Sequence, residues 1–275
     1  ITPIGGPQQH RISASLASMQ VGGLSGTNGD VLGRLLRLLS MHVARLTAAL
    51  ISQNIAAAYL GEAAGRQVLE GSIQRGAGAP ITAVVLVSDL RRSTEISELL
   101  PPEAMLALLN AYFECLTEAI EARGGEVLKF VGDGLLAVFP FDDPGDASTA
   151  AASAYAAATE ALEGISRVNI APPQQLQGID GWQPLRTGIA LHAGEVFFGN
   201  IGSQDRLDFT VIGPAVNMAA RVESMTKDLQ RPLLVTGPVA SLLSQNLEPL
   251  GSFSLRGIAD PVQLYAPRTK DAVEE

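Results

Sequence analysis

The sequence predicts an α+β fold: a ferredoxin-like βαββαβ core with a C-terminal extension, preceded by a helical N-terminal segment. Three observations predict it. Short β-branched or apolar runs alternate with longer stretches of helical periodicity from residue 81 onward. Two of the short runs flank Gly132-Asp133-Gly134, a tight-turn signal that joins them as a hairpin. The resulting order of strand, helix, hairpin, helix and strand is that of a split βαβ layout.

The chain before this core divides into two expected segments. Residues 1–30 are rich in Gly, Ser and Gln without sustained periodicity, so we expect a loose lead-in. Residues 31–80 are expected to form a helical dimerisation or connector segment, with Asp30 as a candidate N-cap. Apolar residues from Leu32 to Leu50 recur at alternating spacings of four and three. This pattern fits a helix that dimerises or relays a signal, and equally an amphipathic helix packed on its own domain.

Residues 81–275 are expected to form the main domain. Its core elements are a β-branched strand at 81–88, a helix with one apolar face at 102–122, hairpin strands at 126–131 and 135–139, an Ala-rich helix at 146–162 and a strand at 185–192. The extension is expected to add a strand at 209–212, a helix at 215–228, a strand at 232–236, a short helix near 240–243 and a closing hairpin at about 253 and 264–265.

Composition argues against several classes of function. The formal net charge is −9, from 19 basic and 28 acidic side chains, so we expect no nucleic-acid partner. The one cysteine, Cys115, excludes a disulfide framework and a multi-cysteine zinc site. It lies in an apolar-periodic run that is typical of a packed core thiol. The three histidines show no ligand spacing.

The apolar segments predict a soluble protein in the cytoplasm. We expect no membrane span, because no apolar run approaches the roughly 20 residues that a membrane-spanning helix requires. The richest stretch, Val31–Leu60, is interrupted by Arg34, Arg37 and Arg45. No signal-peptide pattern is present at the start of the sequence.

Two carboxylates occupy positions that suit metal-assisted chemistry. Asp89 ends the first expected strand, and Asp133 lies at the hairpin tip. In a split βαβ sheet the first strand lies beside the hairpin, so both acids reach one edge of the sheet. Paired carboxylates suit Mg²⁺ or Mn²⁺ and in-line phosphoryl displacement. Taken singly, however, Asp133 is an ordinary hairpin-turn residue and Asp89 an ordinary turn or helix cap.

Five segments, in order along the chain, resemble the class III nucleotidyl (adenylate/guanylate) cyclases. They are Val87-Ser88-Asp89-Leu90-Arg91-Arg92-Ser93-Thr94, Gly124 to Phe139 around Gly132-Asp133-Gly134, Gly188 to Val196, Gly199-Asn200-Ile201-Gly202-Ser203, and Phe209 to Glu223. The resemblance covers about residues 81–265, and it implies the fold and the catalytic domain of that family.

The resemblance also implies a role for each site residue. Asp89 and Asp133 match the metal-binding acids, with the Leu90 carbonyl as a further ligand, for two Mg²⁺ or Mn²⁺ ions per site. Lys129 matches the residue that reads the purine edge and Thr210 its companion, which is the ATP-selective pattern. Asn217 and Arg221 match the catalytic pair for the ribose and the α-phosphate. Arg256 aligns, more loosely, with a lysine that grips the terminal phosphates.

By this resemblance the chain is expected to be an adenylate cyclase that converts ATP to 3′,5′-cyclic AMP and pyrophosphate. The expected partner is a second copy in a head-to-tail homodimer, in which each site combines the acids of one chain with the cations of the other. Two alternatives stay open: a catalytically impaired cyclase-homology module that binds nucleotide or dimerises, and a palm-type enzyme that makes cyclic dinucleotides.

The loop after Asp89 departs from the family pattern. The family has x-Gly-Phe-Thr where this chain has Arg91-Arg92-Ser93-Thr94. Arg92 replaces a glycine, which would strain the loop if the position needs a positive φ, or would place a cation near the polyphosphate. We expect this difference from the family to affect the catalytic rate or the nucleotide affinity, but not the fold.

Overall fold

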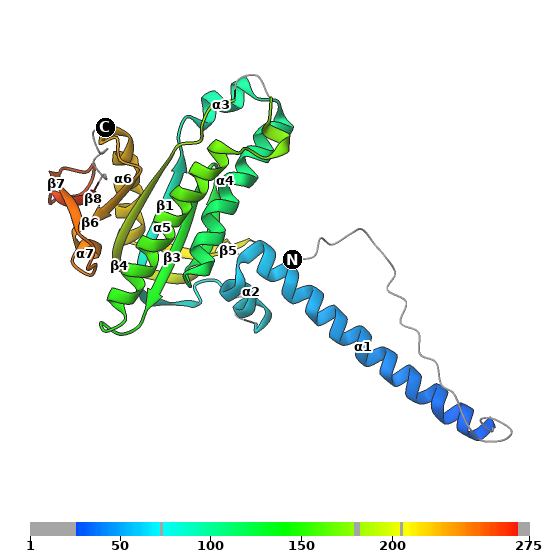
Figure 1. Ribbon diagram of the computed structural model, residues 1–275. Helices are drawn as coiled ribbons and strands as arrows, with labels where there is room; N and C mark the ends of the chain where they lie inside the picture. The colour runs from blue at the N-terminus through cyan, green and yellow to red at the C-terminus, as the bar shows by residue number, and fades with distance from the viewer. Residues whose placement is uncertain (1–25, 72–73, 179–181, 204–205, 269–275) are drawn as a thin grey trace. The chain divides into compact units, whose positions relative to one another are not determined.

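The computed structural model describes residues 26–71, 74–178, 182–203 and 206–268 (Figure 1). The chain divides into two compact units between Ile55 and Ala56. Most of the lead-in expected at 1–30 lies outside the described residues. Its last five residues, 26–30, are helical, so the first helix begins before the predicted cap at Asp30.

The first helix, α1 (Gly26–Leu60), confirms the helical periodicity of the N-terminal segment. The expectation that nothing here is apolar enough to span a membrane is wrong by length and composition. Asp30–Leu60 contains an 18-residue window of mean hydropathy 1.3, none of it buried. Arg45 is the last of the three arginines, and no charged residue stands between it and Glu62. Core helices of soluble proteins and signal sequences meet the same two criteria.

The described residues form one eight-stranded sheet with the order β2-β3-β1-β4-β6-β8-β7, and β5 pairs with β4 beside this path. Its first four strands have the ferredoxin-like order that the sequence predicts. The strands are β1 (Gly78–Leu90), β2 (Glu126–Val131), β3 (Gly134–Phe141), β4 (Thr187–Gly202), β5 (Leu207–Ile212), β6 (Leu233–Thr236), β7 (Leu247–Phe253) and β8 (Val262–Pro267).

Helices cover both faces of the sheet. They are α2 (Glu62–Leu69), α3 (Ser93–Leu99), α4 (Pro102–Ala122), α5 (Ala147–Ile170), α6 (Pro214–Asp228) and α7 (Gly237–Ala240), with a 3₁₀ turn at Gln174–Leu176. Helices α4 and α5 lie side by side and bury their apolar faces against β1, β3 and β4 (Figure 1). Helix α6 packs with the smaller core on the other face. The functional side chains discussed below come from the end of β1 and the hairpin tip, from strands β2 and β5, and from helices α4 and α6 with their neighbouring loops.

The predicted elements are present, but several differ in extent, and the short helix expected near 240–243 lies earlier, at Gly237–Ala240. Strand β4 continues ten residues beyond its predicted end at His192, because Gly194 and Gly199 are accommodated within the extended pairing to β1. Helix α5 continues to Ile170, past the Ala-rich stretch that predicted it. Helix α3 was not predicted; it is a short helix that follows the loop containing Arg92.

Candidate active site

Asp89 and Asp133 lie together where β1 meets the tip of the β2–β3 hairpin. In the antiparallel pairing of β1 with β3, Asp89 stands opposite Gly134, the residue after Asp133. A Cβ atom at Gly134 would lie 2.7 Å from the Ser88 carbonyl oxygen and 3.2 Å from Asp89 Oδ1. The glycine therefore lets the hairpin tip approach Asp89 closely. The structure brings the two predicted acids to one end of the sheet.

The closeness of the two acids affects the pKa of Asp89. Burial raises the pKa of its carboxyl, the negative charge of Asp133 raises it further, and the positive charge of Arg91 opposes both. A half-buried carboxylate beside a second one experiences like-charge repulsion, which Arg91 offsets only in part. A divalent cation is the ligand that would relieve that repulsion, since hard cations prefer carboxylate and carbonyl oxygens.

The donor set fits Mg²⁺ or Mn²⁺ held together with a phosphate ligand. Among the residues that the structure describes, no cluster of three or more His, Cys, Asp or Glu side chains is present. Two carboxylates with the Leu90 carbonyl would leave coordination positions for nucleotide oxygens, the arrangement Mg²⁺ usually adopts. The Leu90 side chain is buried in the main core, which anchors the backbone that carries this carbonyl.

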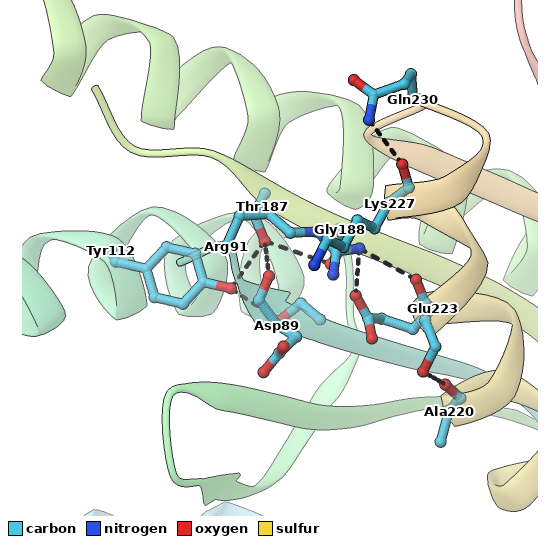
Figure 2. A network of polar contacts seen from close by, with 11 residues as sticks. Asp89, Arg91, Tyr112, Thr187, Gly188, Ala220, Glu223, Lys227 and Gln230 are labelled. Atoms are coloured by element: carbon cyan, nitrogen blue, oxygen red, sulfur yellow. Dashed lines mark hydrogen bonds and ion pairs between the residues drawn. The ribbon is translucent and has the colours of Figure 1, made fainter. Parts of the chain in front are cut away.

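A buried hydrogen-bonded chain fixes the end of β1 (Figure 2). Thr187 Oγ1 donates to the main-chain oxygen of Asp89 at 2.9 Å. The Tyr112 hydroxyl, from α4, lies 2.9 Å from Thr187 Oγ1 and 3.4 Å from Ser88 Oγ. Burial raises the pKa of Tyr112, so its hydroxyl stays protonated and remains a donor. The position of Asp89 is therefore tied to the core.

A second contact joins the end of β1 to α6 (Figure 2). Arg91 Nη2 lies 2.8 Å from Glu223 Oε1 and 3.2 Å from the Glu223 main-chain oxygen. A Cβ atom at Gly188 would collide with the Arg91 guanidinium, so the glycine in β4 leaves the space for this contact. Burial outweighs the attraction of Arg91 and raises the pKa of Glu223 to about 7.

The loop between β1 and α3 has the strain anticipated from its sequence. Arg92 adopts the left-handed conformation with φ 61° and ψ 26°. Its guanidinium makes two contacts within the chain. Nε donates to Glu95 Oε2 at 2.6 Å, and Nη1 donates to Gln183 Oε1 at 3.0 Å. Arg92 therefore occupies a backbone conformation that favours glycine, while its charge is paired within the chain.

Lys129 and Thr210, the predicted base-reading residues, lie on β2 and β5, two strands that contact each other. Lys129 Nζ donates to Asp208 Oδ2 at 2.8 Å, an ion pair between the two strands. A bulge between Val127 and Lys129 interrupts the regular alternation of β2 before this lysine. Thr210 is 3% exposed, and its hydroxyl has no hydrogen-bond partner among the described residues.

Asn217, Arg221 and Arg256 gather around α6 and the turn after β7. Asn217 and Arg221 are four residues apart on α6, so they share a helix face. Asn217 is exposed, whereas Arg221 Nε is buried. A Cβ atom at Gly257 would lie 3.4 Å from Arg221 Nη2, which places the turn that carries the exposed Arg256 against the Arg221 guanidinium.

The predicted site residues thus form separate groups within one chain. Asp89 and Asp133 are together, Lys129 and Thr210 are on neighbouring strands, and Arg221 lies beside the Arg256 turn. Among the ion pairs of the described residues, none joins either acid to Lys129, Arg221 or Arg256. One chain by itself does not join the acids directly to these cations.

Sequence reasoning missed four residues that support these groups. They are Tyr112, Thr187, Asp208 and Glu223. Tyr112 was visible only as part of the apolar face of a helix, and Glu223 only as the last residue of a family-like segment. Asp208 lies two residues before Thr210, and an acid at that spacing in a strand shares its face. This alternation was the one signal by which Asp208 was detectable.

A sequence model of the family described as "Adenylate and Guanylate cyclase catalytic domain" matches residues 80–266, well over half of the chain. The chain belongs to this family. The matched region begins with β1 and ends in β8, so it contains every site residue named above. The α+β fold and the identification as a class III cyclase domain are both confirmed.

Curated relatives and solved structures agree with this assignment. An adenylate cyclase of Anabaena cylindrica is 34% identical over 193 residues, which is 70% of this chain and 36% of the relative. Adenylate cyclase 1 of Rhizobium meliloti is 30% identical over 184 residues, which is 66% of this chain and 26% of the relative. The chain therefore spans between about a quarter and about a third of the length of these relatives.

The structural neighbours include both nucleotide specificities. The adenylyl cyclase CyaB from P. aeruginosa superposes with a TM-score of 0.60 at 28% identity, covering 72% of this chain and 98% of that one. The guanylyl cyclase Cya2 superposes with a TM-score of 0.58 at 31% identity, covering 71% and 97%. The family and fold are thus common to proteins named as adenylyl cyclases and as guanylyl cyclases.

Proposed function

We propose that this cyclase domain is an adenylate cyclase that converts ATP to 3′,5′-cyclic AMP and pyrophosphate. The observation that carries the proposal is the pair of carboxylates, Asp89 and Asp133, held together at one sheet end with like charge that Arg91 offsets only in part. The lysine at the base-reading position, Lys129, favours ATP. Its ammonium group donates hydrogen bonds, and N1 of adenine accepts one, whereas N1 of guanine carries a proton. A location in the cytoplasm, where ATP is available, is part of the same proposal.

In the proposed reaction the ribose 3′-oxygen attacks the α-phosphorus in line. The bond from the α-phosphorus to the oxygen that bridges to the β-phosphate breaks, and pyrophosphate leaves with that electron pair. Divalent ions, when bound, would supply positive charge at the phosphates and favour loss of the 3′-hydroxyl proton. Asp89, Asp133 and the Leu90 carbonyl would hold those ions.

The remaining residues would position the nucleotide and stabilise its charge. Asn217 would orient the ribose, and Arg221 would donate to the α-phosphate oxygens as their charge develops. Arg256 would bind the terminal phosphates; its guanidinium presents two parallel donors where the family has a single ammonium group. Thr210 is the companion of Lys129 in this scheme. Catalysis would come from positioning and charge stabilisation rather than from a covalent step.

A head-to-tail homodimer is the assembly we propose, with each site formed by two chains. The separation of the acids from Lys129, Arg221 and Arg256 within one chain supports it. Exposed apolar side chains near the candidate site also support it: Phe130 and Val131 of β2 and Ile212 of β5 are 52%, 59% and 49% exposed. Such side chains, close to the hairpin tip and the base-reading strands, suit contact with another copy.

The second candidate is a cyclase-homology module that binds nucleotide without turnover. The loop at Arg92 is the observation that favours it, because a strained residue stands where the family has glycine, and its charge is used by Glu95 and Gln183. The retained acids, Asn217 and Arg221 favour the enzyme.

Product analysis of the purified chain decides between these functions. ATP or GTP would be incubated with Mg²⁺ or Mn²⁺, and the nucleotides separated and identified by mass. Adenylate cyclase activity predicts cyclic AMP and an equal amount of pyrophosphate from ATP, and much less cyclic GMP from GTP. Nucleotide binding without product would instead select the module, and a cyclic dinucleotide would select the palm-type alternative.

A further inference from the structure

We propose that Glu223 is a positioning residue of the candidate site that acts through two of its neighbours. It holds Arg91 away from Asp89, which leaves that carboxylate available to a metal ion, and it holds helix α6, which carries Arg221, against the sheet. The inference rests on the proposed function, since Asp89 and Arg221 are the metal and phosphate ligands assigned there. Glu223 itself would touch neither the metal ion nor the nucleotide.

The ion pair of Arg91 with Glu223 has two contacts with α6 (Figure 2). Arg91 Nη2 lies 2.8 Å from Glu223 Oε1 and 3.2 Å from the Glu223 main-chain oxygen. The second contact reaches the helix backbone, so it does not depend on the Glu223 rotamer. The two side chains are only 18% and 8% exposed, so water and salt screen this pair less than an ion pair on the surface. The contact is therefore suited to hold the helix itself.

Strand β4 leaves room for the ion pair at Gly188. A Cβ atom there would collide with Arg91 Nη2, Glu223 Oε1 and Thr226 Oγ1. Thr226 belongs to α6 and is buried. The guanidinium and the carboxylate thus lie in a space enclosed by the end of β1, by β4 and by α6. Because the packing is this close, loss of the ion pair must be taken up by movement of one of these parts.

Asp89 is the alternative partner of Arg91. Pairing of β1 with β4 continues through Leu90, and the Arg91 main-chain nitrogen donates to the Arg186 oxygen at 2.8 Å, so this segment is extended. Side chains two residues apart in an extended segment leave the same face. Among the ion pairs of the described residues, Arg91 nevertheless pairs with Glu223 and not with Asp89. Loss of the Glu223 carboxylate would free a guanidinium that competes with a metal ion for Asp89.

The same contact fixes the orientation of α6. Glu223 and Arg221 are two residues apart, which is about 200° around a helix, so they lie on nearly opposite faces. Movement of α6 at Glu223 would therefore carry the Arg221 guanidinium with it. A misplacement of about 1 Å can cost about a hundredfold in rate. Arg221 is assigned to charge that develops during the reaction, so its misplacement should lower kcat.

The test uses five proteins at pH 8, above the pKa of Glu223 at about 7, so that its carboxyl is ionised. They are the unaltered chain, Glu223→Gln, Arg91→Gln, the double variant and Glu160→Gln. Glu160→Gln is the matched control, because it breaks a more exposed carboxylate–arginine pair, between α5 and Arg123 at the end of α4. Calorimetry without nucleotide gives the Kd of Mn²⁺ alone. Cyclic AMP formation at saturating Mn²⁺ and ATP gives kcat.

The two single variants should differ in metal binding. Glu223→Gln should raise the Kd of Mn²⁺ by about three- to tenfold, because the freed Arg91 pairs with Asp89. Arg91→Gln should not raise it, since the competing charge is gone. The double variant should bind Mn²⁺ no more weakly than Arg91→Gln, and Glu160→Gln should bind it as the unaltered chain does. A merely structural ion pair would give the same Kd in both single variants.

The single variants should agree in kcat. Each should lower it by about tenfold or more, because each removes the anchor of α6. The double variant should fall no further than Arg91→Gln, since the same contact is lost only once. Glu223→Asp keeps the charge on a side chain that is shorter by one methylene, so its effects should have the same direction and smaller size. This variant carries the test if Glu223→Gln does not fold.

Thermal unfolding verifies that each variant is folded before the values are compared. An unchanged Kd of Mn²⁺ in folded Glu223→Gln, an equal rise in Arg91→Gln, or a kcat within twofold of the unaltered chain would each overturn the inference. Cyclic AMP production by the unaltered chain would still uphold the proposed function in these cases. Failure of the unaltered chain to make cyclic AMP would overturn both.

Discussion

The guanidinium of Arg91, two residues after Asp89, lies 2.8 Å from Oε1 of Glu223, two residues after Arg221. One ion pair therefore connects the strand that carries Asp89, a proposed metal ligand, with the helix that carries Arg221, a proposed phosphate ligand. In a head-to-tail dimer these two groups of one chain would serve different sites. The ion pair is well placed to fix the position of α6 relative to the end of β1.

The burial of Glu223 predicts a pH-dependent stability. Its pKa in the folded chain is raised from 4.5 to about 7, so the folded state binds more protons than the unfolded state between these values. Stability from this group is complete below pH 4.5 and is lost as pH rises through 7. Glu223→Gln cannot titrate, so its free energy of unfolding relative to the unaltered chain should rise from pH 5 to pH 8. Urea unfolding at both pH values measures this difference, and a difference that falls with pH would contradict it.

Backbone strain at Arg92 predicts a stabilising substitution. Arg92→Gly relieves the left-handed conformation, while Arg92→Ala removes the same contacts with Glu95 and Gln183 but keeps the strain. We expect the glycine variant to exceed the alanine variant by about 1 kcal/mol in the free energy of unfolding. Denaturant unfolding of the two variants side by side gives this number. Equal stabilities would mean that the loop relaxes without cost.

The hydroxyl of Tyr112 is predicted to support the position of Asp89. Tyr112→Phe leaves the buried Thr187 and Ser88 hydroxyls without their shared partner and should cost about 1–3 kcal/mol of stability. Cyclase activity should fall at a temperature where the variant is still folded. Tyr155→Phe is the control, because Tyr155 is only partly buried on α5. Similar losses in both variants would argue against a specific role for Tyr112.

The repulsion between Asp89 and Asp133 predicts opposite effects with and without metal. In a chelating buffer Asp133→Asn removes the like charge beside Asp89 and should raise the melting temperature slightly. On addition of Mn²⁺ the unaltered chain should gain melting temperature by binding, and the variant should gain much less. Differential scanning fluorimetry across a Mn²⁺ series tests both effects. An equal rise in melting temperature in both proteins would show that Mn²⁺ binds at a site that does not include Asp133.

The sequence predicted the fold well because its signals were local. The apolar face of α4 and the Gly132-Asp133-Gly134 turn specify one helix and one hairpin, and the split βαβ order follows from them. The extent of β4 was underestimated, since glycines that weaken a strand in isolation are tolerated where a long partner such as β1 supplies the pairing.

The site was predictable only in part, for a physical reason. Asp89 and Asp133 were singled out because turn and strand-end positions are visible locally, and Arg92 because it stands where the resembling family has glycine. The structure gives Arg92 the positive φ that such a position implies. The contacts of Lys129 with Asp208 and of Arg91 with Glu223 join residues far apart in sequence. Such pairs depend on how the strands and α6 pack, which no local pattern records.

Complementation between two inactive variants tests most directly whether the site is shared by two chains. Asp89→Ala and Arg221→Ala should each abolish cyclic AMP production, because each removes one half of both sites in its own homodimer. Mixed in equal amounts and allowed to exchange subunits, they form heterodimers with one intact and one doubly damaged site, so about a quarter of the original activity should return. No recovery in a mixture shown to contain heterodimers, or full activity of either single variant, would contradict the account.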